Sequence, residues 1–211
     1  MFFLVLEEEG LEMRSYLYAV RGLAFALLCG VATDAAADEQ AVPAKLLDQI
    51  RAWAASPVVL LTLEASNKRH TGLTEESILT LDKQWRAERK TDDQPLITAV
   101  LASPLSSYLT AIQASSLGLY TEIFVMDNKG LNAGQSAITS DYWQGDEAKF
   151  QKTFPVGPAA VFIDKPEVSD ATGTENVQVN MSITDGVDAV GTVTVEVNLT
   201  ELRRRQTAGK I

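Results

Sequence analysis

The hydrophobic periodicity of this chain changes from helical to strand-like at Tyr120. From this residue onward apolar and polar side chains alternate with a period of two, and the alternation is clearest over residues 175–184 and 190–199. An antiparallel sheet that packs on one face and is wet on the other produces such a pattern. The second half of the chain is therefore predicted to form a sheet.

The residues before Tyr120 carry apolar side chains at helical spacing. Leu46, Leu47, Ile50 and Ala54 form one stripe, and Pro57 should interrupt this helix because proline lacks a backbone N–H. Later helix starts are predicted at Thr74, at Pro95 and at Ser103-Pro104. The sequence predicts an α+β domain: a five-stranded antiparallel sheet with a long N-terminal helical region packed on one face.

The first predicted strand, 120–126, is apolar on both faces apart from Glu122, which favours an interior position in the sheet. Tyr120, Phe124 and Met126 are expected to share one of its faces. The following residues, 127–130 (DNKG), have the composition of a turn, and Asp127 is interpreted as an ordinary turn residue.

The first 37 residues are predicted to be an upstream extension and a signal peptide. Arg14 and Arg21 precede or border the apolar run 22–31, and residues 35–37 supply the small side chains that signal peptidase accepts. The run is well short of the roughly 20 residues that span a bilayer. We expect translation to start at Met13, cleavage to follow Ala37, and the product to reach the periplasm. An uncleaved anchor is the alternative.

Cleavage would leave residues 38–211 as one sensor-sized domain without cysteine, because Cys29 lies in the leader. That domain has 16 basic and 23 acidic residues, a formal charge of −7. An excess of acid disfavours nucleic acids and anionic membranes as partners, because both are polyanions.

Catalytic motifs are scarce in the sequence. His70 is the only histidine, and the polar stretch around it, NKRHTGLT, is expected to be a surface loop at a helix end. Without a second histidine or a cysteine, nucleophilic triads and zinc sites lack members. We therefore predict no enzyme, no cofactor and no metal. A carboxylate-only Ca²⁺ site stays open as an alternative, among Asp141, Asp146 and Glu147 or near Asp164 and Asp170.

Residues 140–150 combine aromatic rings with acidic side chains. Tyr142 and Trp143 offer electron-rich ring faces, and negative charge is supplied by Asp141, Asp146 and Glu147. This composition favours binding of an ammonium group through cation–π contact and charge attraction. The alternative is that Trp143 anchors the loop to the core and the acids are solvated.

Several segments occur in the order found in one family of sensor domains. They are ILTLDKQW (78–85), the turn DNKG, the patch SDYWQ, the strand FIDKP and the closing VGTVTVEVNLTEL. From about Pro43 to Leu202 the chain resembles periplasmic single-Cache (PAS-like, PDC) sensor domains. The resemblance implies ligand binding in signal transduction rather than catalysis. It also implies a pocket between the sheet and the segment after the second strand, here Ser140 to Phe150.

The resemblance further suggests the ligand's chemistry. Amino-acid-binding members of this family hold the ligand carboxylate with an arginine before the aromatic pair, and its amine with an aromatic-x-Asp pair on the next strand. Phe162 and Asp164 match the second element, whereas residues 139–141 (TSD) replace the arginine. A small cationic amine is therefore expected as the ligand. The predicted ligand-binding residues are Tyr142, Trp143, Asp141, Asp146, Phe162 and Asp164.

Thr200 is expected to cap a short helical tail that ends the chain without an output domain. Such a module would present its ligand or its liganded state to a membrane-bound receptor or sensor kinase. The alternative function is a ligand-free accessory subunit of such a receptor or kinase. The run 203–205 (RRR) is expected to be a solvated helix end, with contact to a partner or anionic lipid as its alternative.

Overall fold

The computed structural model describes residues 42–170 and 172–210, so the predicted leader and its cleavage site lie outside the described residues. The helices are α2 (Ala44–Ala54), α3 (Pro57–His70), α4 (Glu75–Glu88), α5 (Pro95–Leu101), α6 (Pro104–Ser115), α7 (Ala148–Gln151), the 3-10 turn η1 (Phe154–Val156) and α8 (Leu199–Thr207). The strands are β1 (Tyr120–Met126), β2 (Asn132–Gln135), β3 (Val161–Ile163), β4 (Glu167–Val168), β5 (Glu175–Thr184) and β6 (Ala189–Asn198).

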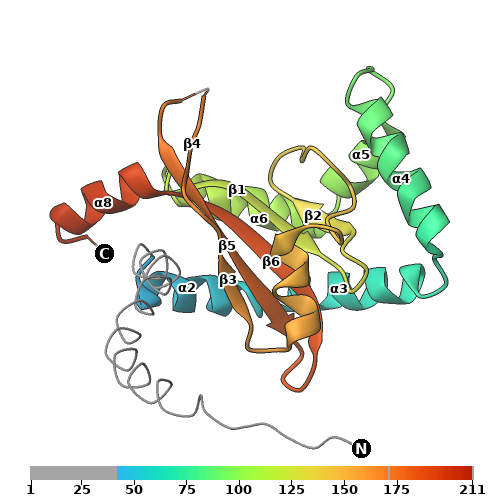
Figure 1. Cartoon of the computed structure of the whole chain (residues 1–211), viewed down its shortest axis with the longest axis horizontal. Helices are drawn as coiled ribbons and strands as arrows, with labels where there is room; N and C mark the ends of the chain where they lie inside the picture. The colour runs from blue at the N-terminus through green and yellow to red at the C-terminus, as the bar shows by residue number, and fades with distance from the viewer. Residues whose placement is uncertain (1–41, 171, 211) are drawn as a thin grey trace, which may run out of the picture. The chain divides into compact units, whose positions relative to one another are not determined.

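All strand pairings among the described residues are antiparallel, and the strand order is β2-β1-β6-β5-β3 with β4 also paired to β5. The predicted fold class is thus confirmed, and β1 is interior to the sheet as expected. In Figure 1 the sheet occupies the middle of the domain, α4 and α5 form an arm at one end, and α8 lies at the other end.

One face of the sheet packs against α2, α3 and α6. The main apolar core joins helical residues such as Leu46, Leu63 and Leu109 to strand residues such as Val179 and Val195, and these five side chains are fully buried. Burying one such side chain contributes roughly 1.5–3 kcal/mol. The helices are therefore held to this face mainly by apolar contact.

The helix starts follow the sequence signals. Thr74 Oγ1 accepts a hydrogen bond from the Ser77 amide at 3.2 Å, and Ser103 Oγ accepts one from the Ser106 amide at 3.1 Å. Proline occupies the first turn of α3, α5 and α6. The break before Pro57 bends α3 by 63° from α2, as the missing N–H requires.

No single helix among the described residues is both long and apolar enough to cross a membrane. Two bent helix pairs, α2 with α3 and α5 with α6, meet the length and composition requirement only when taken together.

The sheet has one strand more than predicted. β3 ends at Ile163, and pairing with β5 resumes at Glu167, opposite Asn176. Pro166 lies in the gap, and a residue without an N–H cannot donate to the strand ladder. The predicted FIDKP strand (162–166) therefore pairs only at its start, and β4 is a short sixth strand that directly follows this segment.

The predicted cap of the C-terminal helix is wrong by two residues. Asn198 caps α8, with its Oδ1 accepting from the Glu201 amide at 2.9 Å, whereas Thr200 Oγ1 accepts from the Glu175 amide at the start of β5. The basic run of α8 makes ion pairs within the domain: Arg204 and Arg205 with Glu201, and Arg203 with Glu175.

His70 and Asp127 are buried, which corrects both sequence interpretations. Asp127 is 0% exposed at the end of β1, and its Oδ2 lies 2.5 Å from His70 Nδ1 and accepts from Ser66 Oγ at 2.9 Å. Its Oδ1 accepts from the amides of Lys129 and Leu131. Ser66 and His70 extend the buried face of α3 beyond its apolar residues, so this helix reaches the β1–β2 turn.

We expect Asp127→Ala to lower the free energy of unfolding by about 3 kcal/mol, because it leaves several buried donors without an acceptor. Asp185→Ala is the matched control. Asp185 also accepts two backbone amides in a turn, and those bonds lower its pKa, but it is exposed. Urea unfolding of both variants measures the difference. Equal losses would show that Asp127 is only a turn residue.

Candidate functional site

The face of the sheet opposite α2, α3 and α6 carries a row of side chains that crosses five strands. The register pairs Gln135 with Phe124, Phe124 with Thr194, Thr194 with Asn180, and Asn180 with Phe162. Directly opposed residues in antiparallel strands point to the same face. Thr194 Oγ1 donates to Asn180 Oδ1 at 2.7 Å, so the centre of this row is a hydrogen-bonded polar pair.

A second row, next to the first, is acidic. Glu122 on β1 opposes Glu196 on β6, and Glu196 opposes Gln178 on β5. The Asp164 amide donates to the Gln178 carbonyl at 2.9 Å, so Asp164 continues the row beyond β3. We name Glu122, Glu196, Gln178 and Asp164 the acidic row. All four residues are half-buried.

A β-bulge in β1 places Glu122 in this row. The pairing with β6 shifts between Tyr120 and Glu122, so that Tyr120 opposes Val197 and lies in the helix-side core. The prediction that Tyr120 shares a face with Phe124 and Met126 is therefore wrong. An extra residue in one strand re-aims the side chains on either side of it, and here that residue is Thr121. Its hydroxyl donates to the Glu196 carboxylate.

Burial, together with the facing carboxylate of Glu196 and against the opposing effect of Lys149, raises the pKa of Glu122 to about 7. Two carboxylates on neighbouring strands repel each other unless a proton or a cation lies between them. The acidic row thus favours a positively charged partner.

A short segment covers part of this face. Phe150 of α7 stacks on Phe154 of η1 with ring centroids 5.3 Å apart, and both pack against Phe124 and Met126. The face predicted to be wet is consequently buried at its centre, where Thr192, Thr194 and Asn180 are 0% exposed. Strand alternation reports which side chains share a face but not what covers that face.

The covering segment, formed by α7 and η1 (residues 148–156), brings two lysines to Phe124 and Phe162, the aromatic residues of the first row. Lys149 Nζ lies 5.4 Å from the Phe124 ring centroid and 2.9 Å from Glu147. Lys152 Nζ lies 4.1 Å from the Phe162 centroid. Both distances suit cation–π attraction, so this face already binds ammonium groups of the protein itself.

Two buried polar atoms at the β2 side of the face have no hydrogen-bond partner among the described residues, Gln135 Nε2 and Asn132 Oδ1. Most buried polar groups in native proteins are paired with protein or with water. These atoms are candidates for contact with water or a ligand.

The predicted residues Tyr142 and Trp143 lie beside α4. Tyr142 is 4% exposed and stacks on Trp85 at 5.3 Å, and burial raises its pKa to about 12. The Trp143 indole N–H donates to the Lys129 carbonyl at 2.8 Å. Asp82 Oδ1 accepts both backbone amides of the pair, at 2.9 and 3.1 Å. Each of these contacts anchors the loop to the core.

The predicted acids are distributed over different surroundings. Asp141 Oδ1 lies 3.0 Å from Arg86 Nη2, and Asp146 is exposed on the loop. Asp164 belongs to the acidic row, next to Phe162 of the first row. The counter-charge of Asp141 is therefore already matched by an arginine within the protein.

The structure does not bring the six predicted residues to one place. Trp143 forms a bridge to Leu131 at the β2 edge, whereas Phe162 lies on β3 at the opposite edge, with three strands between. At roughly 4.8 Å per strand the separation along the sheet is about 19 Å. One small ligand does not span it. The ligand contacts of Tyr142, Trp143, Asp141 and Asp146 stay predictions.

Sequence reasoning missed Glu122, Glu196 and Lys149. Glu122 was visible as the one charge in an apolar strand, and Glu196 as a polar member of an alternating strand. Their proximity depends on the β1–β6 register, which the sequence does not specify.

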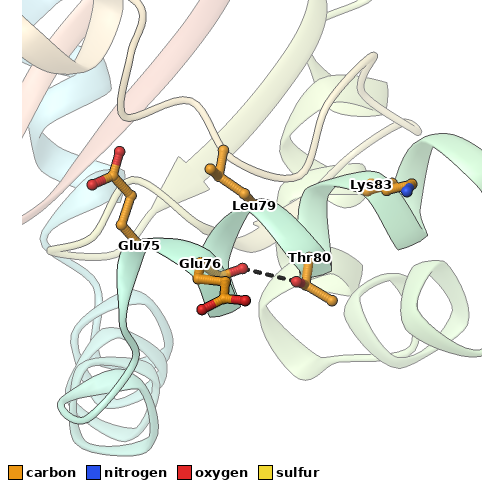
Figure 2. A pocket seen from close by; sticks show the side chains of 5 residues that line it. All are labelled: Glu75, Glu76, Leu79, Thr80 and Lys83. Atoms are coloured by element: carbon orange, nitrogen blue, oxygen red, sulfur yellow. Dashed lines mark hydrogen bonds between the residues drawn. The ribbon is translucent and has the colours of Figure 1, made fainter.

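Two hollows among the described residues lie away from the acidic row and from the loop that carries Tyr142 and Trp143. One, of about 450 Å³, is lined by five exposed side chains of α4 (Figure 2), where Thr80 Oγ1 donates to the Glu76 carbonyl at 2.8 Å. All five come from a single helix, so they do not converge on a ligand. The other, of about 160 Å³, lies between α2 and β5.

The described residues support neither a metal site nor a nucleophilic triad. Among residues 42–170 and 172–210, no group of three His, Cys, Asp or Glu side chains is placed to hold a metal ion. Ser66, His70 and Asp127 do meet, but His70 Nδ1 faces both partners and Ser66 donates to Asp127. A nucleophilic triad needs serine and aspartate on different ring nitrogens.

Comparisons with known proteins give structural neighbours only. Neither a protein-family model nor a curated protein sequence matches the chain. The ligand-binding domain of a Campylobacter jejuni chemoreceptor in complex with 4-methylisoleucine is 14% identical, at a TM-score of 0.36 over 72% of this chain and 64% of that one. That of a Pseudomonas aeruginosa amino acid chemoreceptor in complex with GABA is 10% identical, at 0.32 over 59% and 62%. That of a Pseudomonas fluorescens chemoreceptor in complex with L-serine is 14% identical, at 0.35 over 67% and 56%.

These neighbours are ligand-binding sensor domains, the class that the sequence resembles. This chain spans less than two thirds of the length of each of them. Because the TM-scores are low, no residue role is transferred from them.

Trp143→Ala tests whether this side chain anchors the loop or contacts a ligand. Because its indole packs against Gly145 and donates to Lys129, we expect a loss of about 3 kcal/mol in unfolding free energy. Trp143→Phe retains most of the packing and should lose less. Chemical unfolding measures both variants. A fully stable Trp143→Ala protein that no longer binds any ligand would instead place Trp143 in the site.

Proposed function

We propose that this chain is a periplasmic ligand-binding sensor module that takes a small organic amine on the acidic row. In this proposal a membrane-bound receptor or sensor kinase recognises the domain when its ligand is bound. The observation that supports it is the placement of three carboxylates, Glu122, Glu196 and Asp164, in one half-buried row beside two aromatic rings.

The chemistry of the row selects the charge of the ligand. A bound ammonium group relieves the repulsion between Glu122 and Glu196 and receives charge-assisted hydrogen bonds. A bound carboxylate would add a further negative charge to a partly desolvated site, which is unfavourable. Phe124 and Phe162 flank the acids with ring faces that already attract lysine ammonium groups.

The proposal keeps part of the predicted site and moves the rest. Phe162 and Asp164 retain their ligand-binding roles. Glu122 and Glu196 take the counter-charge role that the sequence suggested for Asp141 and Asp146. Asp141 is less suited because Arg86 neutralises it.

A ligand-free interaction subunit is the second candidate. It is favoured by the covering segment, which fills the centre of the polar face: Thr153 Oγ1 lies 3.1 Å from Thr192 Oγ1, and both residues are 0% exposed. In that case the liganded state does not exist, and partner contact would rest on the outer surface of the domain.

Amine binding is the direct test. A primary amine such as n-butylamine should bind the wild-type protein in calorimetry at pH 8, and an organic acid of the same size should not displace it. Glu196→Gln and Asp164→Asn should each weaken amine binding by about tenfold or more, the effect of removing one charged hydrogen-bonding partner.

Asp141→Asn is the matched control, since it removes one negative charge on the same domain but from an existing ion pair. Amine affinity should be nearly unchanged in this variant. Loss of affinity in Asp141→Asn but not in Asp164→Asn would return the site to the loop 140–150. An absence of amine binding in wild type and variants alike would favour the interaction subunit.

The raised pKa of Glu122 predicts how stability depends on pH. Because the folded pKa of about 7 lies above the ordinary value of 4.5, the folded protein loses stability as pH rises between these values. Glu122→Gln removes this effect, so it should be more stable than wild type by about 3 kcal/mol at pH 8 and equally stable near pH 4. Urea unfolding at both pH values measures the difference. A constant difference across the range would show that Glu122 is not perturbed.

A further inference from the structure

A hollow of about 160 Å³ lies on the helix side of the sheet, between the last turn of α2, the loop 158–160 and the end of β5. Its floor is made by buried residues of the main core, among them Met181, Ile183 and Val193. These side chains point away from the acidic row, because they alternate with the polar residues of β5 and β6. The hollow is therefore separate from the amine site proposed above.

Small side chains leave this space unfilled. Ala54 contributes to the floor, and Ala55, Ala159 and Ala160 lie around it. An engineered apolar cavity of about 150 Å³ is large enough to hold benzene. The hollow thus matches a ligand of about six non-hydrogen atoms with an apolar body.

One charged side chain lines the hollow. Arg51 is exposed at its rim, and among the described residues its side chain forms one ion pair, from Nη1 to Asp48 Oδ1 at 2.9 Å, between two largely solvent-exposed side chains. A guanidinium group has five donors in a planar fork that matches a carboxylate. The lining contains no acidic residue.

Ser182 also lines the hollow, but its hydroxyl does not face it. This residue alternates with Met181 and Ile183 and opposes Thr192, so its side chain points to the other face of the sheet. The apolar floor and the single cation together define an amphipathic site.

We infer that the hollow between α2 and β5 binds a short-chain aliphatic monocarboxylate, with its carboxylate on Arg51 and its alkyl chain on Met181, Ile183 and Val193. A chain of about four carbons fits the volume. The site gives the module an anion-binding position on the face opposite the acidic row, so acid and amine bind independently.

Butyrate is the probe, with n-butanol as its uncharged equivalent, and the binding to the purified protein is measured by calorimetry or by NMR. Butyrate should bind about tenfold or more tightly than butanol, and Arg51→Gln should remove this preference. Lys45→Gln makes the same change of net charge on the same helix, outside the lining, and should leave butyrate binding unchanged.

Filling the hollow is the second arm of the test. Ala54→Leu should abolish butyrate binding, and Ala159→Leu, at an exposed position on the rim, does so with less risk to folding. Equal affinity for butanol and butyrate, or unchanged binding in Arg51→Gln, overturns the inference.

The amine site is tested apart from this one. Glu196→Gln should leave butyrate binding intact, and butyrate should not displace n-butylamine. Displacement would place both ligands on one face of the sheet and overturn the second site, whereas butyrate binding without amine binding would reject only the function proposed for the acidic row.

Discussion

The antiparallel pairing of β1 with β6 is the contact on which the rest of this domain depends. Its register sets Glu122 opposite Glu196 and Phe124 opposite Thr194, and its bulge at Thr121 sends Tyr120 to the other side of the sheet. A shift of one residue would exchange the two faces of β1. The helix-side core and the acidic row would then both be lost, since they use alternate residues of the same strand.

The two faces of the sheet provide different environments for ligands. On the helix side, apolar contact dominates, and one arginine at the rim of the α2–β5 hollow is the charged lining residue. On the opposite side, carboxylates lie beside aromatic rings and lysines delivered by the covering segment. Because the sheet separates them, the two proposed sites would take ligands of opposite charge.

The buried carboxylate of Asp127 has a structural role, unlike the carboxylates of the acidic row. It accepts hydrogen bonds from α3 and from the β1–β2 turn, so its charge is satisfied within the protein. Asp82 does the same for the loop that carries Tyr142 and Trp143. Glu122 and Glu196 face each other instead, with one hydroxyl donor from Thr121 and Lys149 nearby. Unmatched negative charge distinguishes a candidate binding site from a structural anchor.

The sequence alone determined the elements and their apolar faces: periodicity located α2 and β6, and capping residues such as Thr74 and Ser103 located helix starts. These signals are local, so they can be read from neighbouring residues. Tertiary structure decided which residues of these elements contact one another. It buried His70 against Asp127, covered Asn180 and Thr194 with the α7–η1 segment, and placed Tyr142 against Trp85, far from Phe162. The contacts join residues distant in the chain, and strand register and loop packing, which no local pattern encodes, bring them together.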